Sequence, residues 1–250
     1  MRCPWNALSL ALSVIALGVL SIAIASCGSS NASYRIIDAI AAYDYSGTGG
    51  FDIQINGGSA FTGVLFGNID PAGADAYQSI GSGSNTFTAF AHGTTTSPVI
   101  SSSFNFGSRT QYTVMMMGNS PASGAQFPYV AQPFTDDNAS PTSGNFEFRI
   151  IDASTNLPSS VDVYIVGSLG VVTGPNPPSP SATVSYGQAS GYISNAAGPW
   201  YFVVCSSGSH IPLFYTTYTP GALQIRTLVL VDGTGGYGYA TQPLEFDDLN

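Results

Sequence analysis

The sequence predicts an all-β protein: two tandem immunoglobulin-like or transthyretin-like antiparallel β-sandwich domains after an N-terminal signal helix. Three observations lead there. Charged residues make up only 8% of the chain, short apolar runs alternate with turn residues, and one motif occurs twice. So little charge is unfavourable for long solvent-facing helices, whereas 29 glycines and 14 tyrosines suit turns and strands. The apolar runs supply surface to bury, which argues against a disordered chain.

The N-terminus carries an export signal. Arg2 precedes an uncharged apolar stretch over residues 7–25, which is long enough to span a bilayer if it were an uncleaved anchor. The stretch ends in the sequence IASC at residues 24–27, which resembles the lipobox of bacterial lipoproteins. In that family the cysteine is lipidated and becomes the mature N-terminus. The resemblance implies a signal peptide over residues 1–26 and lipidation of Cys27.

Lipidation would place the protein on the cell envelope. Gly28 follows the cysteine, where resembling lipoproteins that stay in the inner membrane carry aspartate, so the outer membrane is favoured. Cys3 leaves with the signal peptide, and Cys205 then has no disulfide partner and lies in an apolar run. We expect Cys205 to be a small buried residue. The membrane, through the N-terminal lipid, is the first predicted partner.

The charge balance excludes nucleic acid as a partner. The chain has no lysine, and five arginines stand against 14 acidic residues, for a formal net charge of −9. Nucleic-acid binding needs clustered Lys and Arg that displace counterions from phosphates. Scattered arginines do not provide this, and the partners left open are an envelope protein or a glycan.

An internal repeat divides the exported part of the chain. The sequence RIIDA at residues 35–39 recurs at residues 149–153, and FDIQI at 51–55 corresponds to VDVYI at 161–165. The order of such matches is kept through both halves, which indicates a duplication of units of roughly 100 residues. The predicted segments are a flexible tether over 27–33, a first β-sandwich over 34–134, a linker over 135–144, a second β-sandwich over 145–246 and a tail over 247–250.

Period-two patterns predict the strands of each unit. In Phe51–Ile55 the three apolar residues share one strand face and the two polar residues share the other. Turn clusters such as residues 81–85 and 206–209 separate the runs, as in a sandwich. No segment after Cys27 has a helical period. Further strand candidates are Thr86–Ala91, Val99–Phe106, Gln111–Met117, Trp200–Cys205, Leu213–Tyr218 and Ile225–Val231.

The repeated motif resembles a known family. RIIDAS at residues 149–154, followed by VDVYI at 161–165, is similar to the opening signature of domain-of-unknown-function family 4397. Residues 35–40 and 51–55 match that signature more loosely. The resemblance covers nearly all of residues 34–246 and implies a secreted or surface β-sandwich module, often in tandem. It implies no catalytic or ligand-binding residues.

A set of charged residues is retained in both copies. One guanidinium can hold a carboxylate through two hydrogen bonds, so pairing within this set is physically reasonable. We expect the two arginines to clamp adjacent strands, each close to a carboxylate of its own domain; a role in ligand binding is the alternative. The structural salt-bridge candidates are Arg35, Asp38, Asp52, Arg149, Asp152 and Asp162.

No catalytic residue, metal site or cofactor is predicted. His92 and His210 are the only histidines; they lie in turn-rich segments at positions that do not clearly correspond, and there is no G-x-S-x-G elbow. No spacing is typical of zinc, and the acidic pairs at 136–137 and 247–248 do not resemble a calcium loop. We expect solvated acids in the linker and tail.

The predicted function is therefore that of a non-catalytic cell-envelope lipoprotein, acting as a structural or interaction (adhesion-like) module. The alternative is a carbohydrate or surface-polymer binding protein that uses loop aromatics, because aromatic rings stack on sugars. Tyrosine is also a good half-buried strand residue, so its abundance alone does not decide. The candidate ligand-binding residues are Tyr43, Tyr45, Tyr129, Tyr237 and Tyr239.

Overall fold

The computed structural model describes residues 31–41, 49–73, 76–122, 124–233 and 242–249. The predicted signal helix and Cys27 lie outside these residues. Nearly all regular structure within them is β, in four sheets, which confirms the all-β sandwich prediction. In the described part of the chain, no helix is long and apolar enough to cross a bilayer.

The first sandwich holds strands β1 to β9. Its inner sheet has the order β4-β1-β8-β9, with β5 also paired to β1, and its outer sheet has the order β3-β2-β6-β7. The inner strands are β1 (Asn31–Asp38), β4 (Ile69–Asp70), β5 (Gln78–Gly81), β8 (Gln111–Met117) and β9 (Val130–Asp136). The outer strands are β2 (Phe51–Ile55), β3 (Gly58–Val64), β6 (Gly83–Ala91) and β7 (Ile100–Phe106).

The second sandwich repeats this plan. Its inner sheet has the order β13-β10-β16-β17 and its outer sheet the order β12-β11-β14-β15. The inner strands are β10 (Asn145–Asp152), β13 (Ile193–Ala196), β16 (Ile225–Val231) and β17 (Gln242–Leu249). The outer strands are β11 (Val161–Val166), β12 (Ala182–Val184), β14 (Trp200–Ser206) and β15 (Pro212–Tyr218), and a short helix α3 (Gly170–Thr173) follows β11.

The strand registers show that the two halves correspond. The strand β1 runs parallel to β8 with Arg35 opposite Thr113, and β10 runs parallel to β16 with Arg149 opposite Thr227. All other pairings between named strands are antiparallel. The repeat detected in the sequence is therefore a repeat of topology and register.

The strands extend further than the sequence patterns indicated. β1 begins at Asn31, inside the range predicted as tether. β9 continues to Asp136 in the predicted linker, because its pairing with β8 holds to Gln111. β17 reaches Leu249 in the predicted tail, because its pairing with β16 continues to Ile225. Backbone pairing with a neighbouring strand sets these ends, and polar composition does not reveal it.

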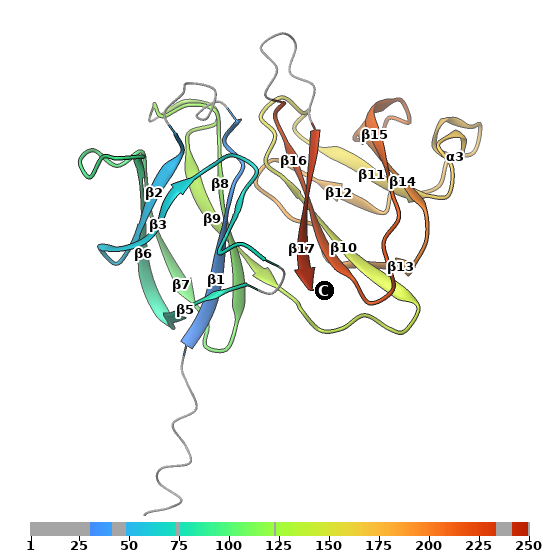
Figure 1. Cartoon of the computed structure of the whole chain (residues 1–250). Helices are drawn as coiled ribbons and strands as arrows, with labels where there is room; N and C mark the ends of the chain where they lie inside the picture. The colour runs from blue at the N-terminus through green and yellow to red at the C-terminus, as the bar shows by residue number, and fades with distance from the viewer. Residues whose placement is uncertain (1–30, 42–48, 74–75, 123, 234–241, 250) are drawn as a thin grey trace, which may run out of the picture.

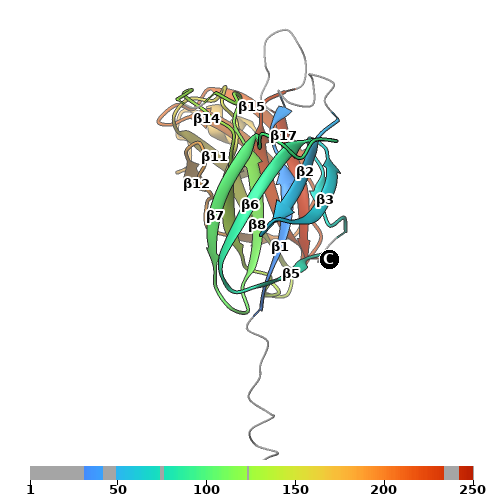
Figure 2. The ribbon, with the colours of Figure 1, turned by 90° about the vertical axis from the view of Figure 1, so that its left-hand side faces the viewer.

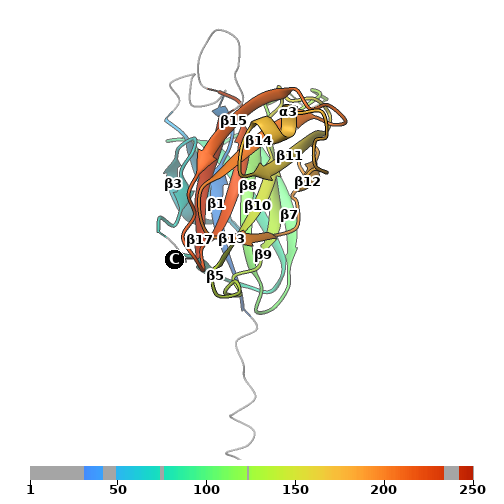
Figure 3. The ribbon, with the colours of Figure 1, turned by 90° about the vertical axis from the view of Figure 1, so that its right-hand side faces the viewer.

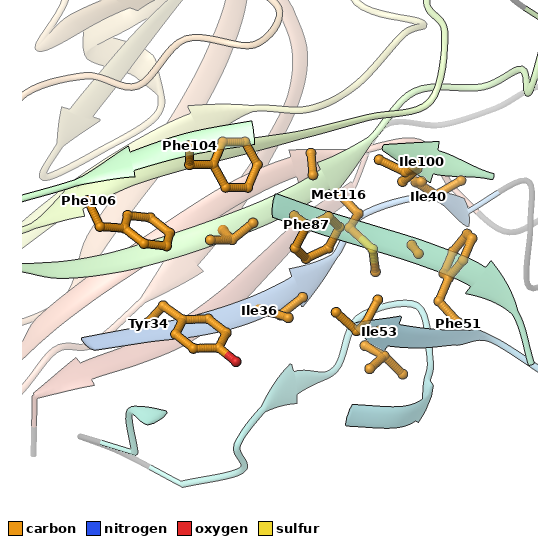
Figure 4. Packing of buried hydrophobic residues seen from close by; sticks show 14 of the residues in the cluster. Tyr34, Ile36, Ile40, Phe51, Ile53, Phe87, Ile100, Phe104, Phe106 and Met116 are labelled. Carbon is orange, nitrogen blue, oxygen red and sulfur yellow. The ribbon is translucent and has the colours of Figure 1, made fainter. Parts of the chain in front are cut away.

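Each sandwich encloses its own apolar core. In the first, aromatic rings from both sheets meet between the layers, with Tyr34 stacked on Phe106 and Phe87 against Phe104 (Figure 4). In the second, Phe148 packs against Phe202 across the same space. These contacts follow from strand alternation, which turns every second side chain inward.

A third apolar cluster joins the two sandwiches. It contains residues from the inner sheet of each half, so the two inner sheets lie face to face and the molecule has four β layers (Figure 1). The outer sheet of the first sandwich faces the viewer in Figure 2, and that of the second does so in Figure 3. The buried members are Ile37, Ala39, Met115, Met117 and Phe134 from the first half and Ile151, Ala153, Val229 and Val231 from the second.

Candidate functional site

The two repeated arginines lie between the sandwiches. Arg35 on β1 and Arg149 on β10 are both buried. Their strand neighbours on either side, such as Tyr34 and Ile36, point into the sandwich core, so the arginines occupy the opposite face of each inner sheet. That face packs against the other sandwich.

Asp136 is the carboxylate that both arginines share. Its Oδ2 lies 3.7 Å from Nε of Arg35, and its Oδ1 lies 2.8 Å from Nη2 of Arg149. Thr113 links the first pair: its hydroxyl accepts a hydrogen bond from Arg35 Nε at 2.9 Å and donates to Asp136 Oδ2 at 2.8 Å. The hydroxyl of Tyr77 also donates to Asp136 Oδ2, at 2.8 Å. We call Arg35, Asp136 and Arg149 the clamp cluster.

Each arginine has the same local setting. The guanidinium carbon of Arg35 lies 5.0 Å from the ring centre of Tyr77, and that of Arg149 lies 5.1 Å from Tyr192. Arg149 donates to the hydroxyl of Thr227 as Arg35 does to that of Thr113. Burial, together with the Asp136 carboxylate, raises the pKa of Tyr77, so its hydroxyl remains a donor at neutral pH.

The clamp cluster connects domains as well as strands. Arg149 is in the second sandwich, while Asp136 ends a strand of the first, and Arg149 also donates to the carbonyl of Thr135 at 3.0 Å. Sequence reasoning missed Asp136 because it compared charges retained in both copies. The acidic pair at residues 136–137, which directly follows the apolar Phe134, was the available signal.

Two of the predicted aspartates brace the turns that follow the arginine strands. Asp38 accepts a hydrogen bond from the backbone N–H of Ile40, and Asp152 accepts one from that of Ser154. Burial raises the pKa of Asp152 to about 7; the Ser154 N–H opposes this rise and the nearby Asp232 carboxylate adds to it. Oδ2 of Asp152 is buried without a hydrogen-bond partner.

The other two aspartates hold the hairpins of the outer sheets. Asp52 accepts hydrogen bonds from the N–H groups of Gly63 and Gly93 and lies 2.8 Å from Nδ1 of His92. Burial opposes ionisation of Asp52, but the hydrogen bonds from His92, Gly93 and Gly63 outweigh it and lower its pKa.

Asp162 repeats this arrangement in the second sandwich. It accepts hydrogen bonds from the hydroxyls of Thr183 and Ser207 and from the N–H of Gly208. Burial again opposes ionisation, and the bonds from Thr183, Gly208 and Ser207 lower its pKa. Gly208 and its counterpart Gly93 both have positive φ, +76° and +77°, which a tight turn requires.

The predicted ligand-binding tyrosines are not brought together in the described residues. Four of them, Tyr43, Tyr45, Tyr237 and Tyr239, lie outside those residues. Tyr129 is half-buried and packs against the core of the first sandwich. Sequence patterns overestimated its exposure, because a tyrosine next to a strand can lean into the core.

Cys205 is the one cysteine among the described residues. Cys205 is fully buried, as predicted, and burial followed by the Asp162 carboxylate raises the pKa of its thiol. Among the described residues, no group of three or more His, Cys, Asp or Glu side chains is arranged to hold a metal ion.

Comparison with known proteins gives a family and a weak structural likeness. The family described as "Domain of unknown function (DUF4397)" matches residues 35–164, which comprise nearly the whole first sandwich and strands β10 and most of β11 of the second. No curated protein matches. A solved structure of a streptococcal virulence factor that binds α-glucan is 10% identical, with a TM-score of 0.25, covering 81% of this chain and 94% of that one.

Proposed function

The chain belongs to the DUF4397 family, and from that premise we propose that it is a non-catalytic cell-envelope lipoprotein that serves as a structural or interaction module. The second sandwich as a separate copy of the family stays a prediction. The observation that carries the proposal is the clamp cluster, because it makes two sandwiches into one body. A module that holds a fixed shape is suited to spacing or presenting surfaces.

Three kinds of contact support this rigidity. The clamp cluster is buried between the inner sheets, and breaking such a buried ion pair is strongly destabilising. Around it lies the shared apolar cluster, with Ile37 and Ile151 fully buried. A hydrogen bond also crosses the junction, because the side chain of Gln132 donates to the backbone carbonyl of Gly187 at 2.9 Å. Relative motion of the sandwiches would break all three.

The proposed anchor would hold this body close to a membrane. Asn31, where β1 begins, follows Cys27 by four residues, and four extended residues reach at most about 14 Å. The strand β1 starts near the anchor, and β1 and β8 both run away from it. The end of the body where these strands finish therefore lies far from the anchor. There the loops of the two sandwiches meet, with Asn119 donating to the hydroxyl of Thr155 (Figure 1).

The histidine–aspartate pair at His92 has a structural explanation. Its counterpart in the second sandwich is Ser207, which contacts Oδ1 of Asp162 as His92 contacts Oδ1 of Asp52. A serine and a histidine therefore do the same work, closing a hairpin against a carboxylate. This repetition supports a non-catalytic role, because a general base could not be replaced by serine.

Intact mass spectrometry of the protein extracted from membranes tests the proposal. We expect the mass of residues 27–250 plus a diacylglyceryl group and an acyl chain, and we expect the Cys27→Ser variant to lack both lipid groups. A wild-type mass that still includes residues 1–26 would show an uncleaved anchor and contradict the lipoprotein assignment. Cys205→Ser is the matched control, since a buried cysteine in β14 should carry no lipid.

A further inference from the structure

A strip of exposed apolar side chains runs along the edge strand of the second sandwich. Ile211, Leu213 and Tyr215 alternate along β15 and its approach, and they are 78%, 46% and 54% exposed. β15 is at the end of the order β12-β11-β14-β15. The ring of Tyr201 on β14 lies beside that of Tyr215, with centroids 6.4 Å apart and planes tilted by 44°. We call Ile211, Leu213, Tyr215 and Tyr201 the β15 strip.

The strip is supported from one side by a small satellite core. The helix α3 covers the outward face of β11 and β14, where Val172 packs with Tyr164 and Val203. Tyr201 lies at the margin of that cluster. Figure 3 shows α3, β14 and β15 on the same side of the molecule. The packing holds Tyr201 in place next to the exposed ring of Tyr215.

This side of the protein also carries almost no charge. Between Asp162 and Arg226 the sequence contains no Asp, Glu, Lys or Arg, and its one histidine is His210. That segment supplies α3, β12, β13, β14 and β15. The acidic residues that give the chain its net charge of −9 lie elsewhere. A charge-free face in an acidic protein fits a neutral partner, because a charged partner would lose its hydration without gaining an ion pair.

The first sandwich has no such strip at the matching place. Thr88 of β6 pairs with Ser101 of β7, and Val203 of β14 pairs with Tyr215 of β15. Thr88 lies two residues before the strand partner of Asp52, and Val203 lies two residues before the strand partner of Asp162. Ser101 therefore occupies the position in the first sandwich that Tyr215 occupies in the second. The polar counterpart shows that the fold does not require an aromatic residue there.

We propose that the β15 strip is a binding site for a neutral polysaccharide. The apolar faces of sugar rings stack on aromatic rings, and two neighbouring tyrosines present such faces side by side. Leu213 and Ile211 extend the apolar surface along the strand. Exposed hydroxyls, such as that of Thr217, flank it and can bond to sugar hydroxyls without charge.

A second copy of the chain is the competing occupant of this edge. Pairing of two β15 strands would add backbone hydrogen bonds at the sheet edge. Pro212, the first residue of β15, lacks an N–H and so weakens such pairing. Two chains of the same net charge would also repel one another. The polysaccharide is therefore the occupant that the surface favours.

Native affinity electrophoresis tests this inference on the full protein extracted in neutral detergent. An acidic protein migrates toward the anode, and bound polysaccharide in the gel slows it. We expect retardation in at least one of three gels containing dextran, mannan or galactan, and none in a gel containing anionic alginate. Tyr215→Ser and Tyr201→Thr introduce the residues of the first sandwich at the matching positions. Each should weaken binding about tenfold, while Ser101→Ala should not change it.

Several outcomes would overturn the inference. They are no retardation in any neutral gel, retardation that Tyr215→Ser leaves unchanged, and retardation only in alginate. Slow migration without polysaccharide that depends on protein concentration and disappears in Tyr215→Ser would assign the strip to a second copy. The inference rests on the proposed role as an interaction module. It does not depend on lipidation. A mass that contradicts the lipid anchor would therefore leave polysaccharide binding untouched, and gels without retardation would leave the anchor untouched.

Discussion

On the inner sheet of the first sandwich, Arg35 bonds to Thr113 and stacks on Tyr77. On the inner sheet of the second, Arg149 bonds to Thr227 and stacks on Tyr192 in the same way. On the outer sheets, a serine at 101 in the first stands where Tyr215 stands in the second. The inner faces thus share an arginine, a threonine and a tyrosine at matching positions, whereas the outer faces differ at this position. Packing of the two inner sheets against each other explains why their faces are similar, because a change on either inner face disturbs both sandwiches.

The inner contact has the form of a two-fold interface within one chain. Ile37 and Ile151, which are equivalent in the repeat, lie in the same apolar cluster, as do Ala39 and Ala153. An interface that uses the same patch on both partners is the arrangement of a symmetric dimer. Across this interface, the carboxylate of Asp136 contacts both Arg35 and Arg149. The stability of the pair should therefore depend more on Asp136 than on any single repeated residue.

The largest expected effect is that of Asp136→Asn. This change removes the carboxylate that both buried guanidinium groups contact, and we expect the free energy of unfolding to fall by about 3–5 kcal/mol. Chemical denaturation followed by circular dichroism measures it. Asp137→Asn is the control, because Asp137 is exposed beside it and should change stability by about 0.5 kcal/mol or less. A loss below about 1 kcal/mol for Asp136→Asn would mean that the apolar cluster alone holds the sandwiches together.

The next effect depends on pH and concerns Asp152. Its folded pKa of about 7 lies above the ordinary value of 3.8, so its contribution to stability is complete below about pH 4 and is lost as pH rises through 7. The shift corresponds to about 4 kcal/mol at most. We expect Asp152→Asn to be more stable than the wild type at pH 8 and similar to it below about pH 4. Equal stability of the two proteins at pH 8 would contradict this burial effect.

Sequence patterns predicted the strands well, and the contacts between the sandwiches poorly. All six further strand candidates coincide with observed strands, because period-two burial is a local property. The junction is not local: the role of Asp136 depends on Arg149 in another domain. The repeat drew attention to Arg35 and Arg149, yet Asp136, which contacts both, was assigned to the linker.

The β15 strip was missed for a related reason. The segment Leu213–Tyr218 was correctly predicted as a strand, but sequence alone does not tell which strand lies at a sheet edge or which face α3 covers. Loop tyrosines drew attention instead. The long segment without charge between Asp162 and Arg226 was visible in the sequence and was the available signal.

A smaller effect is expected at the hairpin aspartates. Asp52→Asn and Asp162→Asn remove charge from a carboxylate that accepts three hydrogen bonds, and each should cost about 2 kcal/mol at pH 7. The folded pKa of each is lowered. The stabilisation is therefore present above about pH 4 and is lost as pH falls through the folded pKa. Unfolding measured at pH 7 and pH 3 should show each variant approaching the wild type at pH 3.

The smallest effect on stability should come from the face that differs most. Tyr215 is more than half exposed, and replacing it with serine should change the free energy of unfolding by about 0.5 kcal/mol or less. Ser101→Tyr, the reverse exchange on the first sandwich, should be similarly mild. Denaturation curves for both variants measure this. A loss of 2 kcal/mol in Tyr215→Ser would show that the ring serves packing against Tyr201. A near-zero change means that the fold gains nothing from an exposed aromatic residue at 215, which leaves binding as the reason for its presence.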